Sequence, residues 1–325
     1  MIGKQRIKYI HSHFFLRMGT EDEVDLNNQI QSLVNTTGEA LAGDEKLFRY
    51  TGRSGFVRLC PNKPAKTGIW HYQLVCYLPS GLPVLISTKA HLASTGLGMK
   101  LPCSDVVKLW GKLILEKGNS SILFMDSYYL DTTGRNWLQE NNIKYIVGLK
   151  KDRFRDITRC LLPHVTKSGQ HCTMFNAKTN EVATFHWSLD ANVGKKLVLA
   201  GNCITRTQHT SGKRGCIPVY DEYAAGFAGC DNFNQIMHGK KWPFETKKSA
   251  AGADYANGWN YMFTSILLNC YHLWVDSDYK NPGAACPWVT SVQAWPKNLY
   301  LYKACIKYSS VINYMDFLFW APRSH

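Results

Sequence analysis

The sequence lacks closely spaced cysteine pairs, long apolar runs and a secretory signal. Its 11 cysteines are scattered singly among 325 residues, and none forms a Cys-x-x-Cys pair. This pattern disfavours a disulfide framework and a structural zinc site, both of which need more regular ligand spacing. No apolar run approaches the roughly 18 to 20 residues that cross a bilayer. The sequence therefore predicts reduced thiols and no membrane partner.

Acidic residues are also scarce. The 24 Asp and Glu residues stand against 38 Lys and Arg, which gives a formal net charge of +14. A surface with this excess attracts polyanions, so nucleic acid is the first partner to consider. The alternative is a solvated basic surface without a partner. No single compact run of Lys and Arg makes a strong nuclear signal, and no internal repeat is present.

The most informative stretch runs from residue 120 to 150. The apolar run Ile122–Met125 predicts a strand buried on both faces, and a helix beginning at Thr132-Thr133 leads to a second strand at Tyr145–Val147. Asp126 directly follows the first strand, at the carboxyl end where ligands gather in an open α/β sheet. An acid at this point is either a turn former or helix cap, or a catalytic group.

Patterns elsewhere predict further strands and helices around this unit. Residues 151–180 are basic and irregular, and no element is predicted there. The predicted elements are strands at 70–77 and 83–87, a helix at 105–116, strands at 182–187 and 196–200, a helix near Asp231, and a long helix at about 254–274 with an apolar stripe of Trp259, Met262, Phe263, Ile266, Leu267 and Cys270.

Several separate motifs occur in an order that resembles the catalytic domain of piggyBac-type transposases and their domesticated relatives, over about residues 44–274. The Pro61-Asn62-Lys63-Pro64 stretch and the Gly-x-Asp element ending in Gln235 are the most specific. The motifs are Asp44-Glu45 with Gly52-Arg53, residues 61–68 (PNKPAKTG), Met125–Tyr129 with Val147-Gly148, Tyr223 through Gly229-Cys230-Asp231 to Gln235, and Lys241-Trp242-Pro243.

The resemblance implies an α/β fold of the RNase H-like type, with a mixed sheet flanked by helices, an irregular insertion and a helical C-terminal tail. It also implies a site of three Asp residues that bind two Mg²⁺ or Mn²⁺ ions. Carried over by motif, the second and third acids are Asp126 and Asp231. A gap-free comparison from Gly68 puts Cys76 at the first position. A thiol is normally neutral and is a soft ligand that suits Mg²⁺ poorly.

The leading interpretation is therefore a catalytically impaired, transposase-derived protein that still binds DNA. The resemblance implies a leader at 1–43, the transposase domain at 44–275 and a tail at 276–325 without a zinc module. It further implies nuclear residence and is compatible with a homodimer. The family's additional acid three residues beyond the third Asp is Asn234 here. The candidate DNA-binding residues are Lys63, Lys66, Lys240, Lys241 and Trp242, the last of which either stacks on a base or anchors the core.

Two other functions remain open at this point. In the first, the protein is an active transposase or nuclease in which Asp44, Glu45 or another acid supplies the missing ligand; the more ordinary role of Asp44 is a cap or an ion pair. In the second, the fold serves as a scaffold for protein interactions without nucleic acid, because fold alone does not fix function.

Overall fold

A computed structural model describes most of the first three quarters of the chain. The described residues are 31, 40–49, 57–61, 66–90, 102–118, 121–150, 152–189, 191, 194–202 and 218–239, together with the single residues 265, 268, 269, 272, 273 and 276.

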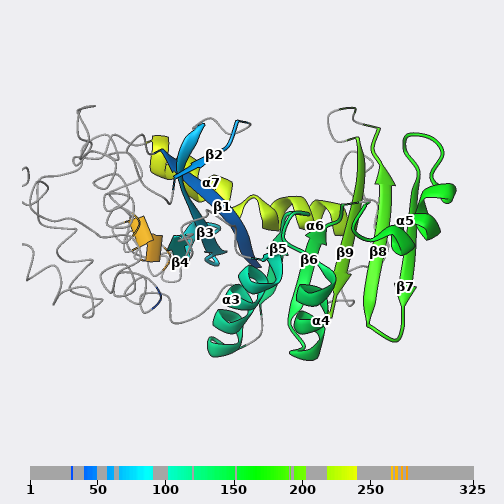
Figure 1. The fold of residues 1–325 in the computed structure, drawn as a ribbon, viewed down its shortest axis with the longest axis horizontal. Helices are drawn as coiled ribbons and strands as arrows, with labels where there is room; N and C mark the ends of the chain where they lie inside the picture. Colours follow the sequence, from blue (N-terminus) through cyan, green and yellow to red (C-terminus); the bar gives the residue numbers. More distant parts are fainter. Residues whose placement is uncertain are drawn as a thin grey trace, which may run out of the picture.

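One mixed sheet of nine strands dominates the described part (Figure 1). Its order is β2-β3-β1-β5-β6-β9-β8-β7, and β4 also pairs with β3. The pairs β1–β5 and β5–β6 are parallel, and all other pairs are antiparallel. The strands are β1 Ala40–Arg49, β2 Val57–Leu59, β3 Thr67–Tyr77, β4 Pro83–Ala90, β5 Ile122–Met125, β6 Lys144–Gly148, β7 His171–Asn176, β8 Glu181–Trp187 and β9 Lys195–Gly201.

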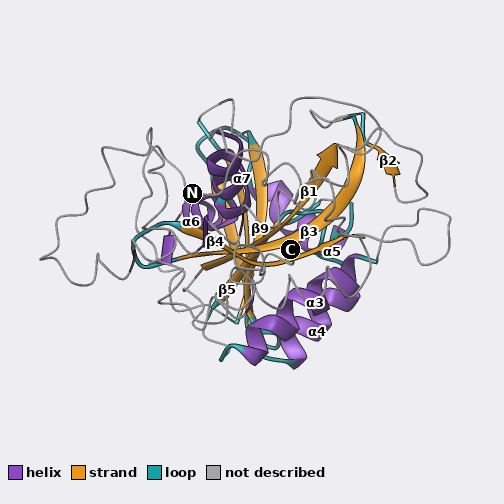
Figure 2. Cartoon of the chain, turned by 90° about the vertical axis from the view of Figure 1, so that its left-hand side faces the viewer, coloured by secondary structure: helices purple, strands orange, loops and turns teal. Residues whose placement is uncertain are grey.

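Helices cover the two faces of this sheet. Figure 2 shows α3 and α4 together on one side of the strands and α6 and α7 on the other. Among the described helices, none is long and apolar enough to cross a membrane. The helices are α3 Cys103–Glu116, α4 Thr132–Glu140, α5 Arg155–Leu161, α6 Pro218–Phe227 and α7 Gly229–Gly239, with a 3-10 turn η1 at Leu162–His164.

The predicted β-α-β unit is present as β5, α4 and β6. The two strands are parallel neighbours, with Met125 opposite Val147. The helix begins at Thr132 as predicted, and Asp131 caps it by accepting a hydrogen bond of 2.7 Å from the backbone N–H of Gly134. The two predicted antiparallel pairs correspond to β3 with β4 and β8 with β9.

Two regions differ from the sequence-based expectation. Strand β1 begins at Ala40 and crosses the expected boundary between residues 43 and 44, so Asp44 lies within a strand rather than before it. Residues 151–180, for which no element was predicted, contain α5 and the edge strand β7. β7 is mostly exposed, so it carries no apolar run that would mark it as a strand.

The apolar stripe predicted within 254–274 lies outside the described residues. The single residues described nearby are helical, and Leu268, Asn269 and His272 are buried. The Asn269 side chain bonds both backbone groups of Leu85 in β4, accepting from its N–H at 2.9 Å and donating to its carbonyl at 2.6 Å. This amide therefore ties the later segment to the edge of the sheet.

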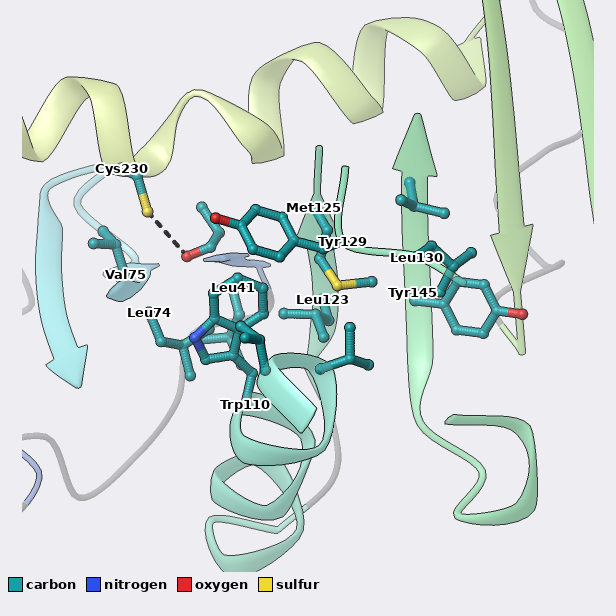
Figure 3. Packing of buried hydrophobic residues seen from close by; sticks show 14 of the residues in the cluster. Leu41, Leu74, Val75, Trp110, Leu123, Met125, Tyr129, Leu130, Tyr145 and Cys230 are labelled. Atoms are coloured by element: carbon teal, nitrogen blue, oxygen red, sulfur yellow. Dashed lines mark hydrogen bonds between the residues drawn. The ribbon is translucent and has the colours of Figure 1, made fainter. Parts of the chain in front are cut away.

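The packing of α3 against β1 requires a glycine at position 43. Gly43 faces Trp110 of α3, and a Cβ at this position would lie 2.6 Å from the indole ring. Trp110 in turn meets Tyr129 edge-on, with ring centroids 4.9 Å apart (Figure 3). Glycine at position 43 thus lets a buried tryptophan lie directly against the strand one residue before Asp44.

A buried polar cluster joins α4 to the antiparallel half of the sheet. Glu181 of β8 accepts hydrogen bonds from Arg135, Tyr145 and Thr179, with the Arg135 Nε bond at 2.7 Å and the Thr179 bond at 2.6 Å. Burial alone would raise the pKa of Glu181, but these donors outweigh burial and lower it. The ionised carboxylate is therefore the form that stabilises the fold.

Glu181→Gln should lower the free energy of unfolding at pH 7 by about 2 kcal/mol, because charge-assisted hydrogen bonds are lost. The folded-state pKa of Glu181 is below its unfolded value of about 4.3, so its contribution is present above that pH and is lost as the pH falls. Urea titrations from pH 7 to pH 3 should show a shallower loss in Glu181→Gln than in the natural chain. Glu140→Gln, which removes an exposed carboxylate from α4, is the control. Parallel curves for Glu181→Gln and the natural chain would contradict the prediction.

Candidate metal and nucleic-acid site

The parallel pairing of β1 with β5 brings two acids together. The last paired residues are Gly43 and Met125, and the next residues along these strands are Asp44 and Asp126. Side chains alternate between the faces of a strand. Ala42 and Phe124, two residues earlier on each strand, both face the α6–α7 side, where added Cβ atoms on Gly229 and Gly226 would meet them. Asp44 and Asp126 therefore share that face.

Helix α7 brings a third acid over the same face. Gly229 lies so close to β1 that an added Cβ would stand 2.8 Å from the Cβ of Ala42. The Cys230 thiol donates a hydrogen bond of 3.2 Å to the Ala42 carbonyl, as the dashed line in Figure 3 shows. Asp231 follows in the first turn of α7, where the positive end of the helix dipole favours a carboxylate.

The electrostatics of neighbouring groups link the three acids. Burial raises the pKa of the Cys230 thiol well above its usual range, and the carboxylates of Asp44 and Asp231 raise it further. Burial likewise raises the pKa of Tyr223, with added contributions from Asp126 and Asp44. Asp44 thus acts on the Cys230 thiol together with Asp231, and on the Tyr223 hydroxyl together with Asp126. The negative charge is concentrated where β5 ends beside the middle of β1.

Cys76, expected at the first-acid position, lies on the opposite face of the sheet from Asp44. Cys76 of β3 pairs with Leu41, three residues before Asp44, and its side chain is fully buried. It lies on the α3 face, where it acts electrostatically on Lys117 just beyond the end of that helix. β3, which carries Cys76, does not pair with β5, whereas β1 does. The residue beside Asp126 is a carboxylate.

Glu45, the other acid weighed from the sequence, points away from this site. It accepts a hydrogen bond from the hydroxyl of Tyr129, which packs against Trp110 on the α3 face. Burial, followed by the charges of Glu45 and Asp44, raises the pKa of that hydroxyl, so it remains a donor at neutral pH. Asp44 and Glu45 therefore point to opposite faces of the sheet.

The donor set at this edge suits a hard divalent ion. Carboxylate oxygens are the ligands that Mg²⁺ and Mn²⁺ prefer, and Asp44, Asp126 and Asp231 supply three of them. Asp126 already accepts two hydrogen bonds from Ser127, through its backbone N–H and, at 2.9 Å, its hydroxyl. Within the described ranges, no three His, Cys, Asp or Glu side chains lie close enough together to form a ligand cluster. Ion binding would therefore require the three carboxylates to approach one another.

A chain of hydrogen bonds runs beside these acids. Lys46, two residues after Asp44 on the same face, donates to Asn234 Oδ1 at 2.8 Å, and Asn234 Nδ2 donates to Gln73 Oε1 at 3.2 Å. Gln73 is fully buried and is the cross-strand partner of Asp44. Burial lowers the pKa of Lys46 to about 7, although Cys230 opposes the shift. Asn234 is thus a structural link between α7 and two strands.

A group of cations lies just beyond Asp126. Lys150 Nζ is 5.3 Å and Arg153 Cζ is 5.5 Å from the ring centroid of Tyr128. Arg153 also donates to the backbone carbonyls of Tyr128 and Leu130, the latter at 3.4 Å. Both cations are exposed. The tyrosine ring therefore gathers two positive charges near the carboxyl end of β5.

The DNA-binding residues expected from the sequence are mostly outside the described part. This applies to Lys63, Lys240, Lys241 and Trp242. Lys66 is described and exposed, and its carbonyl accepts a hydrogen bond of 2.7 Å from the backbone N–H of Cys60, which closes the base of the predicted basic loop.

The comparisons with known proteins support the fold. No protein-family model matches the chain, and no curated protein does. A cryo-electron microscopy structure of piggyBac transposase, in a synaptic complex with hairpin DNA, is similar with a TM-score of 0.62 and 18% identity. The likeness covers 89% of this chain and 55% of that transposase chain. The expected RNase H-like α/β fold is confirmed.

Sequence reasoning missed two parts of this region. The Lys46–Asn234–Gln73 chain joins residues far apart in sequence, so no local pattern could reveal it. The sequence shows Tyr128 after Asp126 and the basic residues Lys150 and Arg153 after β6, but it does not show that they are in contact. Their contact depends on the pairing of β5 with β6.

Tyr129→Phe should lower the free energy of unfolding by about 2 kcal/mol, because a buried acceptor carboxylate loses its donor. Glu45→Gln should cost less, since the amide oxygen still accepts from the hydroxyl. Urea denaturation of both variants measures the difference. If Glu45→Gln cost more than Tyr129→Phe, the carboxylate would have a role beyond this hydrogen bond.

Proposed function

We propose that this chain is a transposase-derived protein whose Asp44, Asp126 and Asp231 form a metal-dependent site for phosphodiester chemistry on DNA. The observation that supports this function best is the β1–β5 register, which follows Gly43 and Met125 with two acids on one face. An acid from α7 lies over the same strand. This proposal replaces the impaired site expected when Cys76 was assigned to the first position.

In this mechanism the three carboxylates hold divalent ions, either Mg²⁺ or Mn²⁺. Bound ions of this kind activate an attacking water or hydroxyl and stabilise the leaving oxygen of a phosphodiester. Asp44 and Asp126 come from adjacent strands of a rigid sheet, so their backbones are fixed relative to each other. Asp231 lies in the first turn of the helix that covers β1 and would supply the third carboxylate to a bound ion.

DNA is the substrate that the charges favour. The chain carries a formal net charge of +14, and Lys150 and Arg153 place two cations over the ring of Tyr128, two residues after Asp126. These cations can contact backbone phosphates without reading sequence, which would hold a strand next to the acids. Lys63, Lys66, Lys240 and Lys241 extend the same proposal to the basic loops, with Trp242 as a stacking residue. The similar transposase was solved with hairpin DNA, which makes a hairpin a suitable first substrate.

A second candidate function is DNA binding without catalysis. It is favoured by the absence, within the described residues, of three acidic, His or Cys side chains close enough to hold an ion. In both proposed functions the same cations bind DNA. The two differ only in whether Asp44, Asp126 and Asp231 can come close enough to bind an ion.

The distinction can be tested by cleavage of a hairpin-ended DNA in Mn²⁺ and in Mg²⁺. We expect Asp44→Asn, Asp126→Asn and Asp231→Asn each to lower the rate by at least about 100-fold, because each removes a charged oxygen ligand. Cys76→Ser, which changes a buried side chain on the opposite face, should retain most of the activity of the natural chain. Silence of the natural chain, with DNA binding intact, would favour the second candidate. Activity that survives Asp44→Asn but not Cys76→Ser would reject the assignment made here.

DNA binding is tested by its dependence on salt. The double variant Lys150→Gln, Arg153→Gln should reduce the slope of log K against log salt concentration by about 2, since two phosphate contacts are lost. Fluorescence anisotropy with one duplex at several salt concentrations measures this slope. Lys167→Gln with Lys178→Gln removes the same charge from exposed positions near the β7–β8 end and is the matched control. Equal slopes in the two double variants would show that the Tyr128 cations do not contact DNA.

A further inference from the structure

The direction in which Asp231 points depends on how α7 is rotated about its own axis. Gly229 and Cys230 set the height of the helix above Ala42, but a thiol is a weak donor and holds the rotation loosely. Asn232 adds a bond of 2.6 Å to the hydroxyl of Tyr77, where its exposed side chain meets competing water. A firmer contact one turn further along is needed to fix the rotation.

Asn234 provides that contact. It lies three residues after Asp231, so the two side chains occupy neighbouring positions on one helix face. Lys46 donates to the amide oxygen of Asn234, which therefore faces β1. The amide nitrogen then faces Gln73 on the next strand. A carboxylate at this position could accept from Lys46 but could not donate to the Gln73 oxygen.

Burial makes this link rigid. Lys46 is 8% exposed and Gln73 is 0% exposed, so water does not compete well for either side chain. Lys46 and Asp44 lie on the same face of β1, and Gln73 pairs directly with Asp44. The two strands that anchor Asn234 are thus the strand that carries Asp44 and its immediate neighbour. Any movement of Asn234 shifts Asp231 relative to Asp44.

We propose that Lys46 and Asn234 are positioning residues that fix Asp231 relative to Asp44 and so set the affinity of the acidic site for a divalent ion. This inference rests on the proposed function, because it requires the three acids to bind an ion. Lys46 acts through its hydrogen bond to Asn234 and does not touch the ion. Partners that orient metal ligands in this way typically contribute about 10-fold to 100-fold in metal affinity.

The test is isothermal titration of Mn²⁺ into the full chain and its variants. Lys46→Met keeps an unbranched apolar side chain as far as the Cε position and removes the donor, and we expect its Mn²⁺ affinity to fall about tenfold. Lys46→Gln keeps a donor without the charge and should recover most of the affinity. Asn234→Ala removes the same bond from the helix side, in a residue that favours helix, and should match Lys46→Met.

Urea denaturation and circular dichroism of each variant show whether α7 remains folded, and Asn234→Ala provides the answer if Lys46→Met does not fold. Unchanged Mn²⁺ affinity in the folded variants would overturn the positioning role and leave the proposed function intact. Lys46→Gln as weak as Lys46→Met would also overturn it, because the charge and not the hydrogen bond would then matter. If the natural chain bound no Mn²⁺, or if Asp126→Asn left its Mn²⁺ binding intact, both the inference and the metal-dependent function would fail.

Discussion

The parallel pairing of β1 with β5 is the interaction on which the rest of the structure depends. The two strands run in the same direction with Gly43 opposite Met125, so the next residues, Asp44 within β1 and Asp126 just after β5, are brought side by side. The helices then follow from this arrangement, because α3 supports β1 from one face and α7 covers it from the other.

The fold and the site differ in how far the sequence predicts them. Ile122–Met125 is apolar throughout because it is buried on both faces, so the strand, its acid and the following helix could all be predicted. β1 could not be recognised as easily, since Asp44, Glu45 and Lys46 interrupt its apolar pattern. The first acid was assigned to Cys76 by a gap-free comparison of motifs, which carries no information on strand pairing. The pairing that brings Asp44 beside Asp126 could not be predicted, because local patterns do not determine it.

The short run from Ala42 to Lys46 has a different task at each residue. Ala42 packs against α7, Gly43 packs against Trp110, and Asp44 faces the candidate metal site. Glu45 then binds Tyr129 on the α3 face, while Lys46 returns to α7 through Asn234. The alternation of a β-strand thus distributes polar side chains to both faces of a buried strand. Each of them has a partner, which is how a central strand tolerates three charged residues in succession.

The close contacts at Gly43 and Gly229 restrict which sequences can occupy these positions, whatever happens to the acids. A side chain at either position would meet Trp110 or Ala42 at less than 3.0 Å, so natural selection for folding alone should retain small residues there. This chain therefore carries a steric constraint at two positions, one before Asp44 and one two residues before Asp231. A variant that had lost both carboxylates would keep the same constraint, because it arises from packing alone.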